Sequence, residues 1–203
     1  MSLQSPRPLE HHSLRPAFKN LSELVKRVEE GELDLGPAYQ RGDVWTTEQR
    51  LYLVKSWLLG VPTGAVVLSD RTNPRWTAAH PDRNPNNTVG EPMWACVDGK
   101  QRITTGVMFH HDELALPASW LPEDHTASAH RTADGPYVLY SGLTRKGRLL
   151  FDRHAGLQVT EARYCADEAE EASLYLLVNG TGTGQAAEDL DRAARTASRH
   201  ACP

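Results

Sequence analysis

The first periodic segment of the chain predicts a short amphipathic helix between residues 20 and 31. Asn20 stands where a helix N-cap is expected, and Gly31 supplies a C-terminal stop. The apolar residues between them fall on one helical face: Leu21, Leu24, Val25 and Val28. Residues 1–19 contain three prolines and no periodicity, so we expect a loose N-terminal arm.

A second helix is expected to start at Thr46 or Thr47, both good N-cap residues, and to end at Gly60, where Pro62 reinforces the stop. Its buried residues are expected to be apolar: Leu51, Val54, Trp57, Leu58 and Leu59. The continuous apolar run at 65–68 then predicts a core strand covered on both faces of a sheet.

The pattern after residue 92 predicts a strand, a tight turn and a helix in succession. Residues 94–97 are apolar and break at Asp98-Gly99. Helical spacing resumes from about Gln101 to His110. This order of elements places a cluster of polar side chains at the end of a strand and the start of a helix.

Further strands and helices are predicted after residue 136. Residues 137–140 and 149–151 predict a hairpin joined by a basic turn at 144–148. Residues 159–164 predict a short strand or the lead-in to a helix. An acidic helix capped by Asp167 is expected to end at Asn179-Gly180 and to be followed by a glycine-rich loop and a last helix, from about 186 to 198.

The length of 203 residues suits one α/β or α+β domain, which we place at residues 20–203. Two stretches, at about 70–92 and 111–136, are too polar and too long for ordinary connections. We expect both to be exposed insertions in that domain.

Composition narrows the function classes. The formal net charge is −4, so the chain lacks the basic character of a constitutive nucleic-acid binder, and any phosphate binding must be local. The three cysteines lack zinc-ligand spacing, which argues against a zinc site or a disulfide framework. No apolar run predicts export or a membrane span, so we expect no membrane partner and a cytoplasmic location.

The segment from Val97 to Thr105 carries the richest candidate chemistry. Gly99 lets the backbone turn tightly and approach a ligand. The helix behind it presents unpaired N–H groups and a positive dipole end, which favour an anion. The residues alone equally allow a capped helix with surface charges, and both interpretations stay open.

Side chains of this segment match the needs of a phosphate site. Lys100 and Arg102 offer charge-assisted hydrogen bonds to phosphate oxygens, and Thr104 and Thr105 offer hydroxyl donors. Asp98 is a candidate to hold Mg²⁺ or to orient water.

A second Gln-Arg pair, Gln40-Arg41, precedes Trp45. A second guanidinium facing Arg102 would suit a polyphosphate or a nucleic-acid backbone. The alternatives are a solvated arginine on a loop and a tryptophan that anchors the core.

The most glycine-rich segment runs from Asn179 to Gln185. It is either a flexible cradle for phosphate or sugar, closed by Asn179 and Thr181, or a helix C-cap and linker. No Gly-Lys-Ser/Thr follows it, so Walker-type nucleotide binding is not supported.

Three segments together resemble a known family. Residues 39–45 (YQRGDVW), 59–62 (LGVP) and 97–105 (VDGKQRITT) are similar, in order and spacing, to the N-terminal domain of GmrSD-type modification-dependent restriction enzymes. That domain belongs to the ParB/sulfiredoxin-like superfamily. The resemblance covers about residues 20–110 and resumes at 177–190, whereas the middle, 111–165, matches nothing we can place.

The resemblance implies a small mixed sheet flanked by helices, with polar insertions. It also implies nucleotide binding or hydrolysis and a part in recognising modified DNA in phage defence. By the same resemblance, one pocket would be lined by Gln40, Arg41, Asp98, Gln101, Arg102 and Thr105 and closed by Asn179 and Thr181. Lys100 departs from the family's more usual glutamine.

Larger relatives carry a C-terminal HNH-type nuclease. This sequence has no His-Asn catalytic pattern. We therefore expect any DNA cleavage to depend on a partner nuclease chain.

Three functions remain open. In the first, the pocket hydrolyses a nucleoside triphosphate, with Asp98, Gln101 and Arg102 catalytic, Arg41 and Gly99 helping to bind phosphate, and Mg²⁺ on Asp98.

In the second, the chain is a DNA-recognition module whose 70–92 insertion and basic turn contact the backbone; the turn's residues are Arg145, Lys146 and Arg148. In the third, the fold serves small-molecule metabolism of a nucleotide or base.

Overall fold

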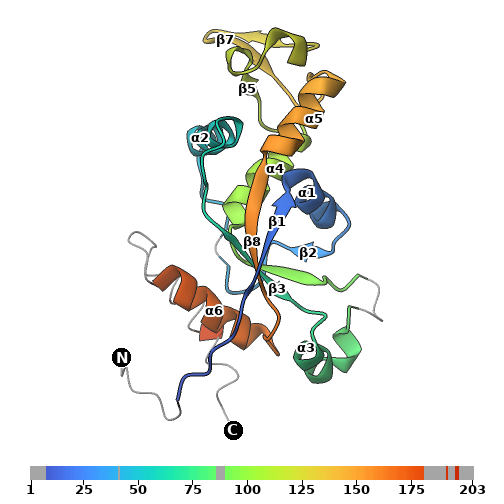
Figure 1. The fold of residues 1–203 in the computed structure, drawn as a ribbon, viewed down its shortest axis with the longest axis vertical. Coiled ribbons are helices and arrows are strands. Elements are labelled where there is room, and N and C mark those ends of the chain that lie inside the picture. The colour runs from blue at the N-terminus through green and yellow to red at the C-terminus, as the bar shows by residue number, and fades with distance from the viewer. Residues whose placement is uncertain (1–7, 41, 86–89, 181–190, 192–194, 197–203) are drawn as a thin grey trace.

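A five-stranded mixed sheet forms the centre of the molecule (Figure 1). The computed structural model describes residues 8–40, 42–85, 90–180, 191, 195 and 196. The strand order is β1-β8-β3-β4-β2, and the bounds are β1 Arg15–Asn20, β2 Leu33–Asp34, β3 Val66–Asp70, β4 Trp94–Asp98 and β8 Gly156–Ala162. The β3–β8 and β2–β4 pairs are parallel, and the β1–β8 and β3–β4 pairs are antiparallel.

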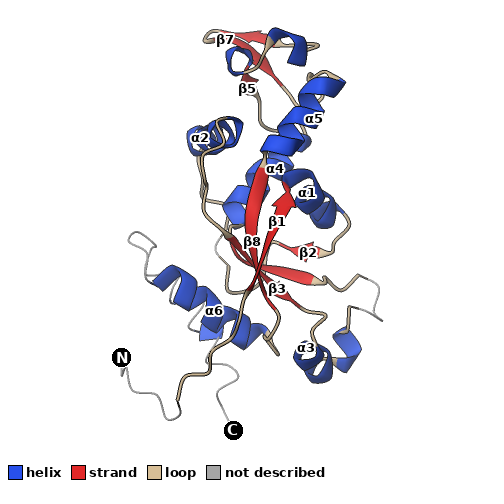
Figure 2. Ribbon diagram, in the orientation of Figure 1, coloured by secondary structure: helices blue, strands red, loops and turns tan. Residues whose placement is uncertain are grey.

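Helices cover both faces of this sheet, as the colouring in Figure 2 makes visible. Their bounds are α1 Leu21–Glu29, α2 Thr47–Leu58, α3 Pro74–Ala79, α4 Lys100–His110, α5 Arg145–His154 and α6 Glu168–Gly180. Val66 and Leu68 pack into the larger core with α1, α2 and α4, whereas Val67 packs with α6. Alternate side chains of β3 thus enter opposite cores, which confirms the predicted core strand and the α/β class with a mixed sheet.

A second, three-stranded sheet lies at one end of the long axis (Figure 1). Its antiparallel order is β5-β7-β6, with β5 Leu116–Pro117, β6 His130–Thr132 and β7 Gly135–Val138. Short 3₁₀ turns fill the rest of this region, at Ala118–Trp120 and Glu123–His125, and another follows α3 at Pro81–Arg83. The insertion predicted at 111–136 therefore contains short ordered elements.

Several predicted signals for helix starts and ends are confirmed by the structure. Thr46 caps α2 in a reciprocal capping box with Gln49, and Gly31 follows α1 with φ +72°. Asp167 accepts the backbone N–H groups of residues 169 and 170 at the start of α6. Within the described residues, no helix is long and apolar enough to cross a bilayer.

The hairpin predicted around the basic segment 144–148 is wrong, because α5 occupies residues 145–154. Thr144 caps this helix by accepting the Gly147 N–H at 3.1 Å. Gly147 and Phe151, four residues apart, form its buried face. A Cβ on Gly147 would lie 2.3 Å from the His125 carbonyl oxygen, so the glycine allows the helix to pack closely.

The N-terminal arm also differs from expectation. Residues 15–20 form β1, which pairs with β8 along its whole length, from Arg15 opposite Glu161 to Asn20 opposite Gly156. This segment lacks an alternating apolar pattern because it is an edge strand whose backbone hydrogen bonds, rather than side-chain burial, hold it in place.

The segment 70–92 was predicted to be an exposed insertion, and the structure corrects this. It contains α3, and its first residues are buried: Asp70, Arg71, Asn73 and Trp76. Asn73 caps α3 and donates to the carbonyl oxygen of Cys165 at 2.9 Å. These polar residues are internal because each has a hydrogen-bond partner there.

A buried ion pair joins β3 to α6. The Arg71 guanidinium donates to both Glu171 carboxylate oxygens, at 3.0 and 2.8 Å, and Glu171 has no exposed surface. Asp34 approaches the same guanidinium at 3.3 Å, and the Trp76 ring lies 4.7 Å from it. Tyr39 donates its hydroxyl to Glu171 at 3.3 Å, and burial raises its pKa well above the ordinary value.

Replacing Glu171 with Gln keeps the volume but leaves the buried Arg71 cation without its main partner. We expect this substitution to lower the free energy of unfolding by about 3–5 kcal/mol, measured by urea denaturation. Glu168→Gln, in the same helix, is the matched control, since the half-exposed Glu168 pairs with Arg83 at 3.4 Å. It should cost less than about 1 kcal/mol. Equal losses from the two variants would contradict the assigned role of the Arg71–Glu171 pair.

Candidate functional site

A small polar pocket lies where β4 ends and α4 begins. Its volume is about 50 Å³, which suits a few water molecules or part of a phosphate group rather than a whole nucleotide. Residues from three separate parts of the chain line it: Gln40, Trp45, Asp98, Gly99, Lys100, Gln101, Arg102, Tyr175 and Asn179. The structure thus brings together most of the residues that the sequence nominated for one site.

Gly99 makes the turn into this pocket. It is the N-cap of α4 and has φ +99°, a left-handed conformation that favours glycine. A Cβ at this position would lie 2.6 Å from Cγ2 and 3.2 Å from Cα of Val66. The close approach of the turn to β3 therefore requires glycine as much as the backbone conformation does.

Asp98 and Arg102 form an ion pair at the pocket. The Nη2 atom of Arg102 donates to Oδ2 of Asp98 at 2.8 Å and to the carbonyl oxygen of Ala65 at 2.8 Å. The Nε atom of Arg102 is buried and has no hydrogen-bond partner among the described residues. These two hydrogen bonds fix the Arg102 side chain in position beside the pocket.

Gln101 is held from one end only. Its Nε2 atom donates to the Gly42 carbonyl oxygen at 3.0 Å, whereas its Oε1 atom is buried with no partner among the residues the structure describes. A buried acceptor without a donor is costly, so this oxygen is a candidate to interact with a bound group.

Arg50 and Thr105 support the floor of the site from behind. Arg50, buried in α2, donates to the Thr105 hydroxyl at 3.0 Å and contacts the Asp43 carboxylate. Thr105 in turn donates to the Gln101 carbonyl oxygen at 2.8 Å. Sequence reasoning missed Arg50, although it shares the buried stripe of α2 with Leu53 and Trp57.

Gln40 closes another side of the pocket and is also structural. Its Nε2 atom donates to the carbonyl oxygens of Cys96 and Val97, at 2.8 and 2.6 Å. Tyr175 and Asn179 reach the pocket from α6, one turn apart, and Asn179 donates to the Tyr175 carbonyl oxygen at 2.9 Å. Tyr175, which the sequence did not nominate, packs against Tyr39 with ring centroids 5.7 Å apart.

Two of the predicted hydroxyl donors do not face this pocket. Thr105 is fully buried and committed to Arg50 and the Gln101 carbonyl, so it does not reach a phosphate. Thr104 does not line the pocket either. The remaining nominated residues, Arg41 and Thr181, lie outside the described residues.

The basic residues predicted to contact DNA lie in the first turn of α5. Lys146 donates to Asp124, and Arg148 donates to the carbonyl oxygens of Leu143 and Ser141, at 3.0 and 3.4 Å. Arg145 is exposed at the helix start. Two of the three side chains therefore have structural partners.

The described residues contain no group of three or more His, Cys, Asp or Glu side chains placed to hold a metal ion. Cys96 is fully buried, and burial raises the pKa of its thiol far above the ordinary value. Cys96 is therefore an inert core residue.

One family model matches most of the chain. A family model described as the GmrSD restriction endonuclease, N-terminal domain, matches residues 21–193. An uncharacterized protein of Methanocaldococcus jannaschii is 36% identical over 93 residues, which cover 43% of this chain and 16% of that protein. The chain thus corresponds to a small part of that relative's length.

The Gly99 turn can be tested with an alanine substitution. Gly99→Ala adds a Cβ that collides with Val66 and a side chain in a left-handed conformation, and we expect it to cost about 2–3 kcal/mol of unfolding free energy. Gly31→Ala is the control, because its φ is +72° and a Cβ there meets nothing within 4 Å. It should cost about 1 kcal/mol, and a Gly99→Ala variant no less stable than Gly31→Ala would argue against the close contact.

Proposed function

Because the chain belongs to the GmrSD restriction endonuclease N-terminal domain family, we propose that its Asp98 pocket binds the phosphate chain of a nucleoside triphosphate and promotes hydrolysis. Membership supports a part for the chain in a restriction-type system, and by the same resemblance we include phage defence in the proposal. The observation that carries the proposal is the Asp98–Arg102 pair at the start of α4, beside two buried polar atoms without partners.

The geometry supports phosphate as the bound group. The start of α4 presents backbone N–H groups and the positive end of the helix dipole, as helix N-termini do in other anion sites. Arg102 adds a fixed positive charge, and Lys100 lines the same pocket. The pocket's small volume implies that only the terminal phosphate enters, while the rest of the nucleotide lies outside its mouth.

In the proposed reaction, water attacks the terminal phosphorus. A new P–O bond forms to the water oxygen, the bridging P–O bond breaks, the leaving nucleoside diphosphate takes the electron pair, and the proton lost by the water passes to solvent. Arg102 stabilises the negative charge on the phosphate oxygens, and Asp98 accepts a hydrogen bond from the attacking water. The partly buried Arg102 keeps its orientation because the Ala65 carbonyl oxygen accepts a hydrogen bond from it.

Magnesium fits the donor set of this pocket. Asp98 supplies a carboxylate and Gln101 supplies the unpartnered side-chain oxygen Oε1, and both are the hard oxygen ligands that Mg²⁺ prefers. When bound with a nucleotide, Mg²⁺ would neutralise phosphate charge. One or two protein ligands are typical where phosphates complete the coordination shell.

The hydrolase proposal is tested by phosphate release from nucleoside triphosphates and deoxynucleoside triphosphates in the presence of Mg²⁺. We expect Asp98→Asn and Arg102→Lys each to lower the rate by at least about 100-fold with the fold intact, judged by circular dichroism and thermal unfolding. Asp134→Asn, at an exposed position away from the pocket, should leave the rate unchanged. Wild-type protein that releases neither phosphate nor pyrophosphate from any of these nucleotides would refute the proposal.

A second candidate, a DNA-recognition module, is favoured by the family's description as a restriction endonuclease. A partner nuclease chain would then supply cleavage. Of the three nominated basic residues, Arg145 is the one that the structure leaves best placed for a DNA phosphate, because Lys146 is neutralised by Asp124 and Arg148 caps carbonyl oxygens.

This candidate makes a prediction that separates neighbouring residues. Arg145→Ala should weaken binding of a labelled DNA duplex several-fold and flatten its dependence on salt, measured by fluorescence anisotropy. Lys146→Ala, whose cation is already paired, should have a smaller effect. Equal effects, or no duplex binding by the wild type at low salt, would count against a DNA contact at α5.

A further inference from the structure

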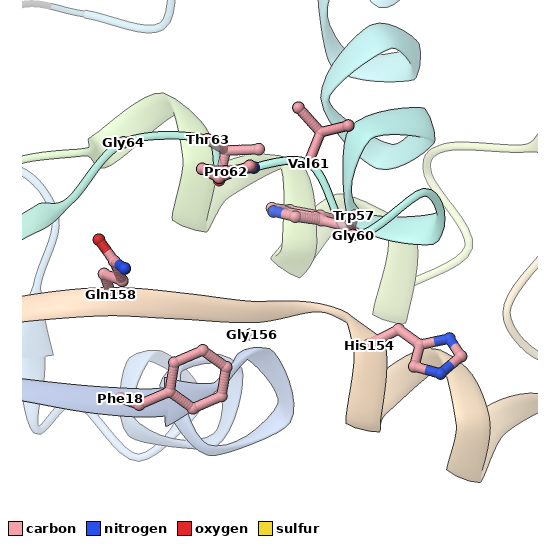
Figure 3. Close-up of a pocket in the computed structure, with 10 residues that line it drawn as sticks. All are labelled: Phe18, Trp57, Gly60, Val61, Pro62, Thr63, Gly64, His154, Gly156 and Gln158. Atoms are coloured by element: carbon pink, nitrogen blue, oxygen red, sulfur yellow. The ribbon is translucent and has the colours of Figure 1, made fainter.

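A second cavity lies beside the loop that connects α2 to β3, and Figure 3 shows the side chains around it. Its volume is about 260 Å³, several times that of the Asp98 pocket. The residues around it come from β1, α2, the connecting loop, α5 and β8: Phe18, Trp57, Gly60, Val61, Pro62, Thr63, Gly64, His154, Gly156 and Gln158.

Trp57 gives this cavity an unsatisfied donor. Its side chain is 2% exposed, yet its Nε1 atom has no hydrogen-bond partner among the described residues. In Figure 3 the indole lies beneath the loop, with its nitrogen at the end of the ring that faces the Gln158 side of the cavity. A buried N–H without a partner costs free energy, and a ligand that carries an acceptor would recover it.

The walls limit the chemistry of the ligand. Apart from His154, no lining residue has an ionisable side chain, so the cavity offers no fixed charge to an ion. Phe18, Val61 and Pro62 offer apolar surfaces suited to the faces of a ring. Gln158 adds an amide that both donates and accepts hydrogen bonds.

The cavity is a built feature of the backbone. The loop above it starts and ends with glycines in left-handed conformations, Gly60 at φ +70° and Gly64 at φ +80°. On the opposite side, a Cβ on Gly156 would lie 1.9 Å from Cζ of Phe18, so the glycine gives the Phe18 ring its place across β8.

We infer that this cavity, which we call the Trp57 pocket, binds a nucleobase. A nucleobase is a flat, uncharged ring with acceptors on its edge, and those are the properties that the Trp57 N–H, the Gln158 amide and the apolar walls together select. The base belongs either to a nucleotide or to a DNA strand, because both present the same ring chemistry.

The Trp57 pocket lies near the Asp98 pocket, which suits a base from either a nucleotide or a DNA strand. Val67 of β3 pairs with Asp98 on one side and with Thr160 of β8 on the other, so Asp98 and Thr160 lie two strand spacings apart, about 10 Å. Gln158 of the pocket lies two residues from Thr160 along β8. The same loop that roofs the Trp57 pocket leads to Ala65, whose carbonyl oxygen holds Arg102. A phosphate at Asp98 and a base in the Trp57 pocket are therefore neighbours. The inference does not require that the phosphate be hydrolysed.

The full chain labelled with ¹⁵N at the indole nitrogens tests this directly by NMR. The chain has five tryptophans, and Trp57→Phe identifies the Trp57 signal. On titration with adenosine, cytidine, guanosine or thymidine, at least one should shift the Trp57 indole N–H signal in a saturable way. Benzene, a ring without an acceptor, should bind at least about tenfold more weakly.

Two variants separate the pocket from the rest of the fold. Gln158→Met keeps an exposed side chain of similar length without the amide, and we expect about tenfold weaker base binding. Thr160→Val, two residues further along β8 and not part of the lining, should bind like the wild type. Asp98→Asn should also retain base binding, so failure of the hydrolase proposal is distinguishable from failure of this one.

Two further titrations identify the source of the base. A larger gain in affinity from the nucleoside to its triphosphate than to a single-stranded oligonucleotide assigns the pocket to a nucleotide, and the reverse assigns it to DNA. If no nucleoside, nucleotide or oligonucleotide moves the Trp57 signal of the folded protein, the inference is wrong. It is also wrong if benzene binds as tightly as the bases and Gln158→Met changes nothing.

Discussion

The ion pair between Arg71 and Glu171 is the interaction on which the arrangement of the candidate site depends. It is buried on both sides and ties the end of β3 to α6, a helix 100 positions further along the chain. Glu171, Tyr175 and Asn179 are spaced four residues apart, so they share one face of α6. Fixing Glu171 therefore also fixes the two residues of α6 that line the Asp98 pocket. Buried ion pairs of this kind are costly to break. Breaking this one would also free α6, and with it Tyr175 and Asn179, from its fixed position beside the pocket.

The same ion pair reaches the pocket by a second route. Tyr39 donates to Glu171, and its neighbour Gln40 braces the last carbonyl oxygens of β4. Those carbonyls precede Asp98 directly, so the position of the carboxylate follows from contacts made on the far side of the sheet. On the near side, Arg50 of α2 donates to Thr105 of α4, which in turn donates to the Gln101 carbonyl oxygen. The polar groups of the pocket are thus held by buried hydrogen bonds, which is the rigidity that the proposed phosphate binding requires.

Sequence periodicity predicted α1, α2, β3, β4, α4 and α6, because each buries a regular apolar face or run and carries a clear end signal. The family resemblance, rather than periodicity, predicted that Asp98, Gln101, Arg102 and Asn179 line one pocket, because it spans distant segments of the chain. Arg50, Arg71 and Glu171 could not be assigned in this way. Each is a charged residue in a buried position, and its burial depends on a partner far away in the sequence rather than on local pattern. The hairpin predicted at 137–151 failed for a related reason, since Gly147 in α5 is explained only by the His125 carbonyl packed against it.

The Asp98–Arg102 ion pair also affects how a phosphate would bind in the pocket, because both groups already interact with each other. Without a ligand, the carboxylate occupies one of the donors of Arg102, so the two charges satisfy each other beside an opening of about 50 Å³. In the proposed function an incoming phosphate competes with Asp98 for that guanidinium. Repulsion between the phosphate and the carboxylate is reduced because the positive charge of Arg102 and the start of α4 lie at the same point. A cation that accompanies the nucleotide would lower the repulsion further, which is a physical reason to expect phosphate binding to strengthen with Mg²⁺ rather than to be independent of it.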